Sequence, residues 1–268
     1  MVSPFREVRQ EREKRATVLA YHQVDRRRDF AWNMLSPERL ARQMEILARR
    51  GFRGATFREA AEGGTGIVGI TFDDALEGVV RYGLPVLRAF GFRATLFVPT
   101  AWAGKRNDWD TRLAGRRTAH AGWDDLARAA GAGWEIGSHG HTHRDMTLLT
   151  AEEAEGELRL SRERIREWTG DRADSIAWPF GQADGKLAGA ARRAGFRRGC
   201  LSVPDGIPGD PLRSGRVGVR RFEGDAEFLA KIEGGPLYRC QVWKDRVAHF
   251  VSLATPRLWH RIRRIEAA

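Results

Sequence analysis

Two short segments of the chain carry acidic and imidazole side chains with the spacing of a metal site. The segment 71–74, TFDD, ends an apolar run with Asp73 and Asp74. Neighbouring side chains of a strand point to opposite faces, so both aspartates can serve one site only where the strand ends. In the segment 137–143, GSHGHTH, His139 and His143 have the i, i+4 spacing that places two imidazoles on one face of a helical turn.

Together, Asp74, His139 and His143 form a set of two histidines and one carboxylate, which is typical of catalytic zinc with room for a water. Zinc lowers the pKa of its bound water from 15.7 to about 7 and polarises a carbonyl. Asp73, held off the metal, could then accept the proton of that water. The set therefore predicts hydrolysis of an amide or an ester.

Other interpretations of these residues stay open at this point. Taken alone, the two aspartates also fit an exposed turn that caps a helix, and the histidines also fit a solvated loop. His141 would point elsewhere from a helical turn, although a different geometry would make it a third imidazole ligand. Non-haem iron oxygenases use the same ligand types. Their histidine and carboxylate usually lie close together in the sequence, whereas here the close pair is two histidines.

The elements that must position these residues alternate between short apolar runs and helical patterns, as repeated βα units do. Such an α/β chain predicts a parallel, barrel-like sheet whose active site lies at the C-terminal ends of the strands. The predicted strands are 17–24, 66–72, 94–100, 134–139, 175–180, 197–203 and 216–222. The predicted helices are 37–50, 78–90, 123–132, 151–169, 185–194 and 225–233.

Several helix ends carry a recognisable cap. Ser36 followed by Pro37 predicts an N-cap with proline in the first turn. The segment 150–153, TAEE, predicts a capping box. Three glycine–phenylalanine pairs after helical patterns predict glycine caps that lead into the next strand: Gly51, Gly91 and Gly195.

A third segment, 177–181 with the sequence AWPFG, says little alone, but with TFDD and SHGHTH it resembles the polysaccharide deacetylases, the NodB-like carbohydrate esterases of family 4. The resemblance runs from about residue 16 to residue 235. It implies a distorted (β/α)7 barrel and removal of acetyl groups from an N-acetylated oligo- or polysaccharide. It also implies Asp73 as catalytic base, with a divalent metal on Asp74, His139 and His143: zinc first, cobalt or nickel as alternatives.

The chain departs from that family's pattern in three places. Ala75 replaces the usual glycine after TFDD, Ala177 replaces the arginine that pairs with the catalytic base, and Phe180 replaces a tyrosine. The backbone N–H of Phe180 could still stabilise an oxyanion, because that task needs no side chain. Trp178 and Pro179 are the accompanying candidates for substrate contact. We expect Arg216 or Arg220 to supply the missing positive charge. A catalytically impaired carbohydrate-binding relative and a different metal-dependent amidohydrolase are the alternatives.

The family's catalytic acid is usually a histidine near the C-terminus, but His249 and His260 lie in an amphipathic tail. The segment 19–24, LAYHQV, instead resembles the exopolysaccharide-associated subgroup, in which the motif order is permuted. His22 is therefore the candidate acid that protonates the leaving amine. A buried core histidine is the alternative interpretation of His22.

Composition limits the partners and the compartment. The chain has 268 residues and a net charge of +11, which favours an anionic neighbour, yet no helix-turn-helix, zinc-finger or RNP pattern predicts nucleic-acid binding. We expect a basic extension at 1–15, a catalytic domain at 16–235 and a basic amphipathic helical tail at 236–268. The tail would pack on the barrel or contact a membrane surface.

The start has no signal-peptide pattern, so we expect a cytoplasmic protein, with peripheral membrane attachment as an option. Cys200 and Cys240 favour two thiols over one disulfide.

Overall fold

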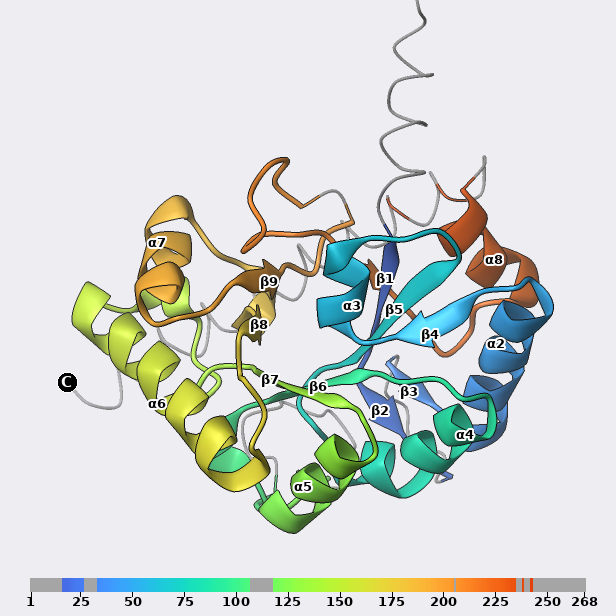
Figure 1. The fold of residues 1–268 in the computed structure, drawn as a ribbon, viewed down its shortest axis with the longest axis horizontal. Coiled ribbons are helices and arrows are strands. Elements are labelled where there is room, and N and C mark those ends of the chain that lie inside the picture. Colours follow the sequence, from blue (N-terminus) through green and yellow to red (C-terminus); the bar gives the residue numbers. More distant parts are fainter. Residues whose placement is uncertain are drawn as a thin grey trace, which may run out of the picture.

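A mostly parallel sheet with helices outside it forms the frame of the molecule (Figure 1). The computed structural model describes residues 16–26, 33–106, 118–204, 206–234, 238 and 242. The main sheet has eight strands in the order β10-β1-β5-β6-β7-β8-β9, with β4 paired to β5. Its strands are β1 (Thr17–Tyr21), β4 (Arg53–Ala55), β5 (Ile67–Phe72), β6 (Thr95–Val98), β7 (Glu135–Ser138), β8 (Ser175–Ala177), β9 (Arg198–Cys200) and β10 (Val217–Gly218).

A two-stranded sheet, β2 (Gln23–Val24) and β3 (Met34–Leu35), lies beside the main sheet. The α-helices are α2 (Pro37–Arg49), α3 (Phe57–Glu62), α4 (Leu84–Ala89), α5 (Trp123–Gly131), α6 (Ala151–Thr169), α7 (Gly185–Arg193) and α8 (Asp225–Glu233). A π-helical turn, η1 (Val79–Gly83), precedes α4, and the short 3-10 turns are η2 (Thr100–Trp102), η3 (Met146–Leu148) and η4 (Pro179–Gly181).

The segment 214–219 joins the two ends of the sheet. The Ser214 N–H donates to the Gly199 carbonyl at 3.0 Å, and Ser214 accepts from the Leu201 N–H at 2.9 Å. A few residues later, β10 pairs in parallel with β1, with Val217 opposite Leu19. These bonds connect β9 to β1 through one short segment, which agrees with the distorted barrel predicted from the sequence.

The observed elements follow the predicted ones except where they are very short. Helices α6 and α8 have the predicted bounds. The predicted strand 17–24 stops at Tyr21, and the chain continues into β2 after His22. Only Val217–Gly218 of the predicted strand 216–222 is a strand. Strand β4 and helix α3, of three and six residues, were not predicted.

The predicted caps are present. The Ser36 side chain accepts from the Arg39 N–H, and Thr150 and Glu153 form a capping box. Gly51, Gly91 and Gly195 follow their helices with φ values of 77°, 67° and 92°, in the left-handed region where glycine has no Cβ penalty.

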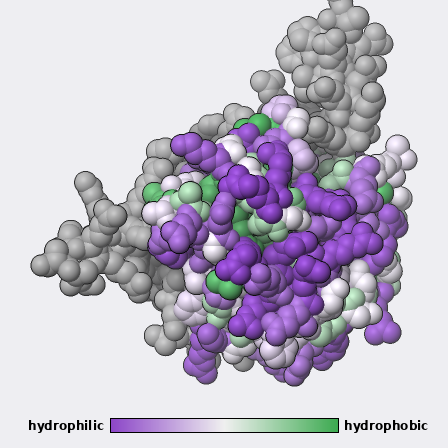
Figure 2. Space-filling model, turned by 60° about the vertical axis from the view of Figure 1, so that its left-hand side comes forward, coloured by the Kyte–Doolittle hydropathy of each residue, from purple (hydrophilic) through white to green (hydrophobic). Residues whose placement is uncertain are grey.

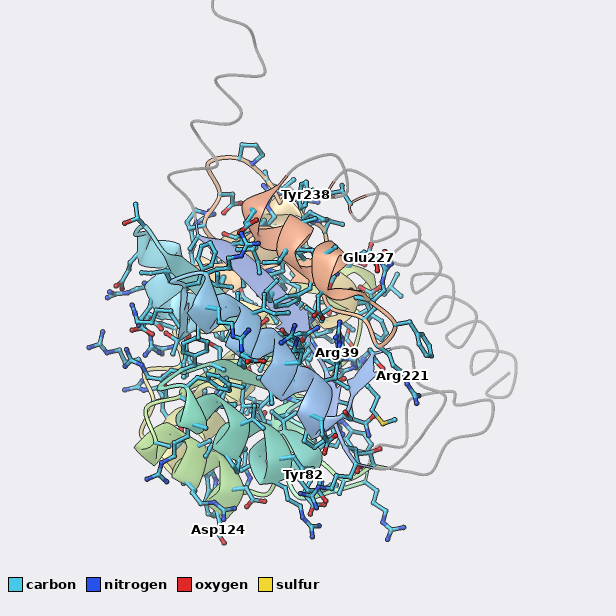
Figure 3. All side chains as sticks on the ribbon, turned by 90° about the vertical axis from the view of Figure 1, so that its right-hand side faces the viewer. Arg39, Tyr82, Asp124, Arg221, Glu227 and Tyr238 are labelled. Carbon is cyan, nitrogen blue, oxygen red and sulfur yellow. The ribbon has the colours of Figure 1, made fainter. Side chains whose placement is uncertain are left out.

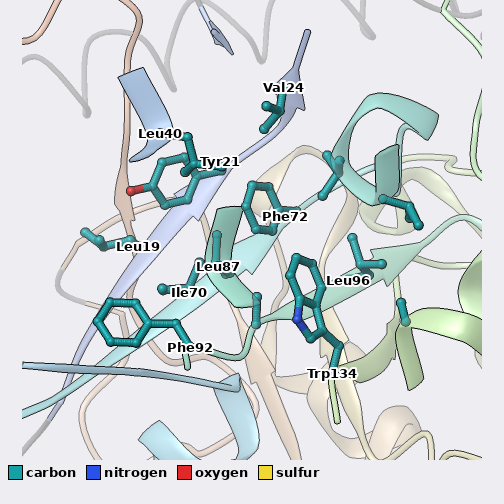
Figure 4. Close-up of a cluster of buried hydrophobic side chains, with 14 of the residues drawn as sticks. Leu19, Tyr21, Val24, Leu40, Ile70, Phe72, Leu87, Phe92, Leu96 and Trp134 are labelled. Carbon is teal, nitrogen blue, oxygen red and sulfur yellow. The ribbon is translucent and has the colours of Figure 1, made fainter. Parts of the chain in front are cut away.

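Aliphatic and aromatic side chains form the core between the sheet and the helices (Figure 4). Phe72 stacks on Trp134 with ring centroids 5.7 Å apart, and Tyr21 lies 5.2 Å from Phe72 on the other side. A second cluster under α6 and α7 contains Trp178. A third, which contains Val18, Phe97 and Cys200, is formed by the side chains that alternate with those of the first two. Alternation along each strand thus separates an outer from an inner face.

The outer surface is largely polar. On the side where Figure 1 shows α6 and α7, hydrophilic residues cover most of the face (Figure 2). Helices α2 and α8 pack side by side (Figure 3), and the Arg39 guanidinium lies 2.7 Å from the Asp225 carboxylate between them. None of the helices in the described ranges has the length and hydropathy needed to cross a membrane.

Three predictions concern residues outside the described ranges. They are the basic extension at 1–15, most of the tail at 236–268 and the second thiol, Cys240. The membrane or packing role of the tail therefore stays a prediction. Cys200 is a buried free thiol, and burial raises its pKa to about 12.

Candidate metal centre

Strand alternation directs the candidate site residues into the barrel. In β5 the outward side chains Ile70 and Phe72 belong to the first core cluster, so Thr71 and Asp73 point inward. The same alternation turns His139 inward after β7. All of these residues lie at the C-terminal ends of their strands, which is the edge where the sequence predicted an active site.

Asp74, His139 and His143 converge as predicted. One ligand atom from each lies within 4.8 Å of the others. The Nε2 atoms of His139 and His143 are 3.7 Å and 3.4 Å from Oδ1 of Asp74. The two imidazole rings pack edge to face, with centroids 4.8 Å apart. Two separate strand ends therefore bring three metal-ligating atoms to one point.

The two histidines converge for a different reason from the predicted one. Residues 139–143 form a loop and not a helical turn, so the i, i+4 argument was wrong for this segment. Gly140 and His143 have φ values of 75° and 61°, and these left-handed residues turn the chain back on itself. His141 points away, with Nδ1 at 2.8 Å from the Thr100 hydroxyl.

A buried carboxylate from α6 fixes this loop. Glu157 accepts from the backbone N–H groups of His141 and Thr142 at 2.7 Å and 2.8 Å, and from the Thr142 hydroxyl. Its residue is only 7% exposed, so water offers little competition for these bonds. The sequence analysis missed Glu157. A glutamate on the inward face of an otherwise exposed helix is the signal that could have identified it.

Asp74 is held in an unusual backbone conformation. Asp74 and Ala75 have φ values of 63° and 44°, where residues with a Cβ are uncommon. His120 donates from Nδ1 to the Asp74 carbonyl at 2.6 Å, and the Ala121 N–H donates to the Ala75 carbonyl at 2.8 Å. The left-handed φ of Ala75 explains why a glycine would suit that position. No local motif marks His120, and its role was not predicted.

The donor set fits a divalent metal ion. Oδ1 of Asp74 is buried and has no hydrogen-bond partner among the described residues, as a ligand atom reserved for a cation would be. The Nδ1–H of His139 donates to the Ala177 carbonyl at 2.7 Å, which leaves the Nε2 lone pair directed at Asp74. Burial, with His139 nearby, lowers the pKa of His143 to about 3, so its imidazole is neutral, as ligation requires.

The carboxylates of the site are ionised. Burial alone would raise the pKa of Asp74, but His143 and His139 outweigh it, and the pKa is lowered. For Asp73, burial is likewise outweighed by the Arg216 guanidinium, and its pKa lies far below the ordinary value.

Arg216 supplies the positive charge beside Asp73 that the sequence analysis expected from Arg216 or Arg220. Its Nη1 and Nη2 donate to the two oxygens of Asp73 at 2.7 Å and 2.8 Å, a bidentate pair in which both side chains are buried. Nη1 also donates to the Thr71 hydroxyl at 3.0 Å. Of the two predicted arginines, Arg216 is thus the one that pairs with Asp73, while the backbone N–H of Arg220 donates to the Glu223 carboxylate.

His22 lies at the break between β1 and β2, beside Asp73. Its Nε2 is 4.0 Å from Oδ2 of Asp73, and its side chain is 33% exposed. The imidazole therefore faces both the candidate base and the surface, which is the position that a proton donor to a bound substrate needs.

The third motif divides between the site and the core. Phe180 has a φ of 56° and its ring lies 5.1 Å from that of His143, so this residue borders the metal centre. Pro179 is buried next to it. The Trp178 side chain points the other way, as strand alternation requires after the inward Ala177. It is 0% exposed and donates from Nε1 to the Leu212 carbonyl at 2.7 Å, so its position is that of a core residue and not of a substrate contact.

Comparison with known proteins gives similarities in sequence and in fold. A family model described as polysaccharide deacetylase matches residues 60–199. The protein YxkH of Bacillus subtilis (strain 168), named as a polysaccharide deacetylase, is 24% identical over 135 residues, which are 50% of this chain and 44% of YxkH. The chain thus spans less than half of that relative.

Solved structures share the fold at low identity. The Streptococcus pyogenes deacetylase PplD in complex with acetate has a TM-score of 0.70 and 16% identity, covering 81% of this chain and 97% of PplD. IcaB from Ammonifex degensii has a TM-score of 0.68 and 21% identity, covering 81% of this chain and 94% of IcaB.

Proposed function

Because the chain belongs to the polysaccharide deacetylase family, whose model matches more than half of it, we propose that it is a metal-dependent hydrolase that removes acetyl groups from a glycan containing N-acetylglucosamine. The observation that carries the proposal is the meeting of Asp74, His139 and His143 beside Asp73 at one edge of the sheet. Two histidines and one carboxylate leave coordination positions open, which is typical of catalytic metal sites.

The residues suit zinc, with cobalt or nickel as alternatives. A divalent ion bound there would polarise the acetyl carbonyl and lower the pKa of a water. The protein supplies neutral imidazoles, a buried carboxylate and a fixed His139 tautomer. Both carboxylate oxygens of Asp73 accept hydrogen bonds from Arg216, which holds this carboxylate off the metal. Asp73 can therefore act as the general base and not as a metal ligand.

The proposed reaction consumes one water for each acetyl group. The water oxygen bonds to the acetyl carbon, and Asp73 takes a proton from that water. The carbon–nitrogen bond then breaks, and His22 gives a proton to the leaving nitrogen, so the products are acetate and a free amine. The Arg216 guanidinium lowers the pKa of Asp73, so the carboxylate is ionised before each turnover and holds the accepted proton only briefly.

Phe180 is the proposed oxyanion donor. Its left-handed backbone brings the end of the third motif next to His143, and a backbone N–H directed there would stabilise charge on the acetyl oxygen. Pro179 limits the backbone freedom of this turn because its ring fixes φ.

The position of Arg216 bears on the alternative of an impaired relative. The loss of the usual arginine at Ala177 and the replacement of a tyrosine by Phe180 were the reasons to consider that alternative. A buried guanidinium from the residue directly before β10 now contacts the candidate base with two hydrogen bonds. An active hydrolase is therefore the better-supported function.

Acetate release from a panel of N-acetylated oligosaccharides tests the proposal, with the metal-loaded protein compared with the chelated one. We expect Asp73→Asn to retain the metal, measured by elemental analysis, while its turnover falls by about 10²- to 10⁴-fold, the usual contribution of a general base. Activity that survives chelation, or full activity of Asp73→Asn, would contradict the assignment. Release of acetate only from non-sugar amides would instead identify a different amidohydrolase.

A further inference from the structure

The turn at 220–223, directly after β10, lies beside the end of β1 that carries His22. Strand β10 is parallel to β1, with Gly218 opposite Ala20, and the Val219 N–H donates to the Ala20 carbonyl at 2.9 Å. Adjacent strands are about 4.8 Å apart, and the turn follows the end of β10 just as His22 follows the end of β1. No part of the proposed chemistry uses this turn.

Buried polar contacts from helices α2 and α8 hold the turn in place. The Arg220 N–H donates to the Glu223 carboxylate at 2.7 Å. The Lys231 ammonium from α8, fully buried, pairs with the same carboxylate and donates to the Gly218 carbonyl. The Arg39 guanidinium from α2 donates to the Glu223 carbonyl. Burial of a lysine–glutamate pair costs desolvation, so an ordinary connecting loop has no need of such support.

The supported turn displays an aromatic ring. Phe222 is 74% exposed, the highest value among the large hydrophobic residues of the described ranges. The guanidinium of Arg221, which Figure 3 shows near the margin of the drawn side chains, lies 5.3 Å from the centre of this ring. Single exposed hydrophobic residues are common on protein surfaces. This one differs because a fixed turn holds it beside the active edge of the sheet.

We propose that Phe222 and Arg221 form a binding subsite for a sugar unit next to the one that is deacetylated. One face of a pyranose ring carries C–H groups that pack on an aromatic ring, and its hydroxyls accept hydrogen bonds from a guanidinium. The occupant is thus an N-acetylated oligosaccharide that extends from the metal centre over the turn. The inference rests on the proposed function for the identity of the glycan.

Binding and turnover of the N-acetylglucosamine pentamer test this subsite. Calorimetry measures the Kd of the pentamer, and acetate release gives kcat/KM for the pentamer and for 4-nitrophenyl acetate. For Phe222→Ala we expect about a tenfold weaker Kd and a similar loss of kcat/KM on the pentamer, as for a phenyl ring that is partly buried by the ligand. The small ester, which cannot reach the turn, should show no change. Phe222→Tyr, which retains the ring, should restore binding.

Leu160→Ala is the matched control, because Leu160 is an exposed hydrophobic residue on α6. It should leave all three measurements unchanged. Equal pentamer binding by the wild type and Phe222→Ala, or no binding by the wild type, overturns the subsite. Loss of binding to anionic phospholipid vesicles in Phe222→Ala, with pentamer binding intact, overturns it in favour of membrane contact. Pentamer binding that depends on Phe222 without acetate release supports the subsite and refutes the proposed function.

Discussion

An arginine pairs with carboxylates at each of the two ends of the barrel, and the two clusters differ in whether every buried carboxylate oxygen has a hydrogen-bond partner. At the N-terminal ends of the strands, Arg58 contacts Asp171 at 2.6 Å and Asp174 at 3.1 Å. Arg198 adds a second cation on Asp174, and Glu135 accepts from the hydroxyls of Thr95 and Ser175. At the C-terminal ends, Arg216 pairs with Asp73 and also donates to the Thr71 hydroxyl and the Leu201 carbonyl, whereas Oδ1 of Asp74 has no hydrogen-bond partner among the described residues.

The backbone differs in the same way. Five non-glycine residues in the described ranges have a left-handed φ, and four of them lie at the metal centre: Asp74, Ala75, His143 and Phe180. Residues in such conformations persist only where the surroundings impose them, and they concentrate at functional sites. The comparison separates a polar cluster that stabilises the fold from one whose bonds are left open for a ligand.

Of the substitutions that test this comparison, Asp74→Asn should have the largest effect on metal binding and acetate release. Loss of the ligand charge should remove the metal and reduce acetate release by more than about 10³-fold, since metal activation of the water would be lost. The metal-free variant should be about as stable as the metal-free wild type, because Oδ1 of Asp74 accepts no hydrogen bond from the described residues that the substitution could break. Asparagine also tolerates the left-handed backbone.

Denaturant unfolding in the presence of chelator measures that stability difference. The matched variant is Asp171→Asn at the opposite end, where the carboxylate bonds to Arg58 and to the backbone N–H groups of Ile136 and Ala173. It should lose stability and keep the metal. A destabilised Asp74→Asn protein would show that Asp74 is a structural residue.

Arg58→Met should have the largest effect on stability. Its removal leaves three buried carboxylates with one cation fewer, and breaking such a buried network costs about 3 kcal/mol or more. Activity per folded molecule should remain close to that of the wild type, because the cluster lies at the far end of the strands. Urea unfolding combined with active-site titration by metal content separates the two quantities. A normal unfolding midpoint would contradict the structural role.

The sequence predicted the elements that have strong local signals. The bounds of α6 follow from the Thr150 capping box and from Gly170, which ends the helix with a φ of 68°. Helix α3 escaped detection although Thr56 and Glu59 form a capping box there, because six residues show no helical periodicity. Strand β4 is too short for alternation to be visible.

The sequence predicted which residues form the site better than it predicted how they are arranged. TFDD and the two histidines identified the ligands, but only the folded chain shows that a loop, and not a helical turn, brings His139 to His143. Choosing Arg216 over Arg220 required the register of the closing segment, which joins β9 to β1. Trp178 was misplaced because it was grouped with its motif neighbours Pro179 and Phe180, whereas alternation after the inward Ala177 turns its side chain into the core. Glu157 and His120 act through tertiary contacts that no local pattern records.

Glu157→Gln should have the smallest effect of these substitutions, and we expect it on metal affinity. The carboxylate accepts from two backbone N–H groups and one hydroxyl of the ligand loop, whereas the neutral glutamine oxygen would bond the two N–H groups more weakly than the charged one does. The loop that positions His143 would loosen, and metal affinity should fall by about 10- to 100-fold, as for other residues that orient ligands. Turnover at saturating metal should change little, because His139, Asp74 and Asp73 keep their own contacts.

Competition with a chromogenic chelator gives the metal Kd of this variant. Glu153→Gln is the matched control: Glu153 lies one turn earlier on α6 and is exposed, and its side-chain hydrogen bonds within the described ranges go to the Thr150 cap and Arg144. That substitution alters a helix cap without touching the loop, so it should leave the metal Kd unchanged. Equal Kd values for the two variants would mean that the turn geometry of Gly140 and His143 positions the ligands without help from α6. A selective loss in Glu157→Gln would extend the metal centre to a helix outside the sheet.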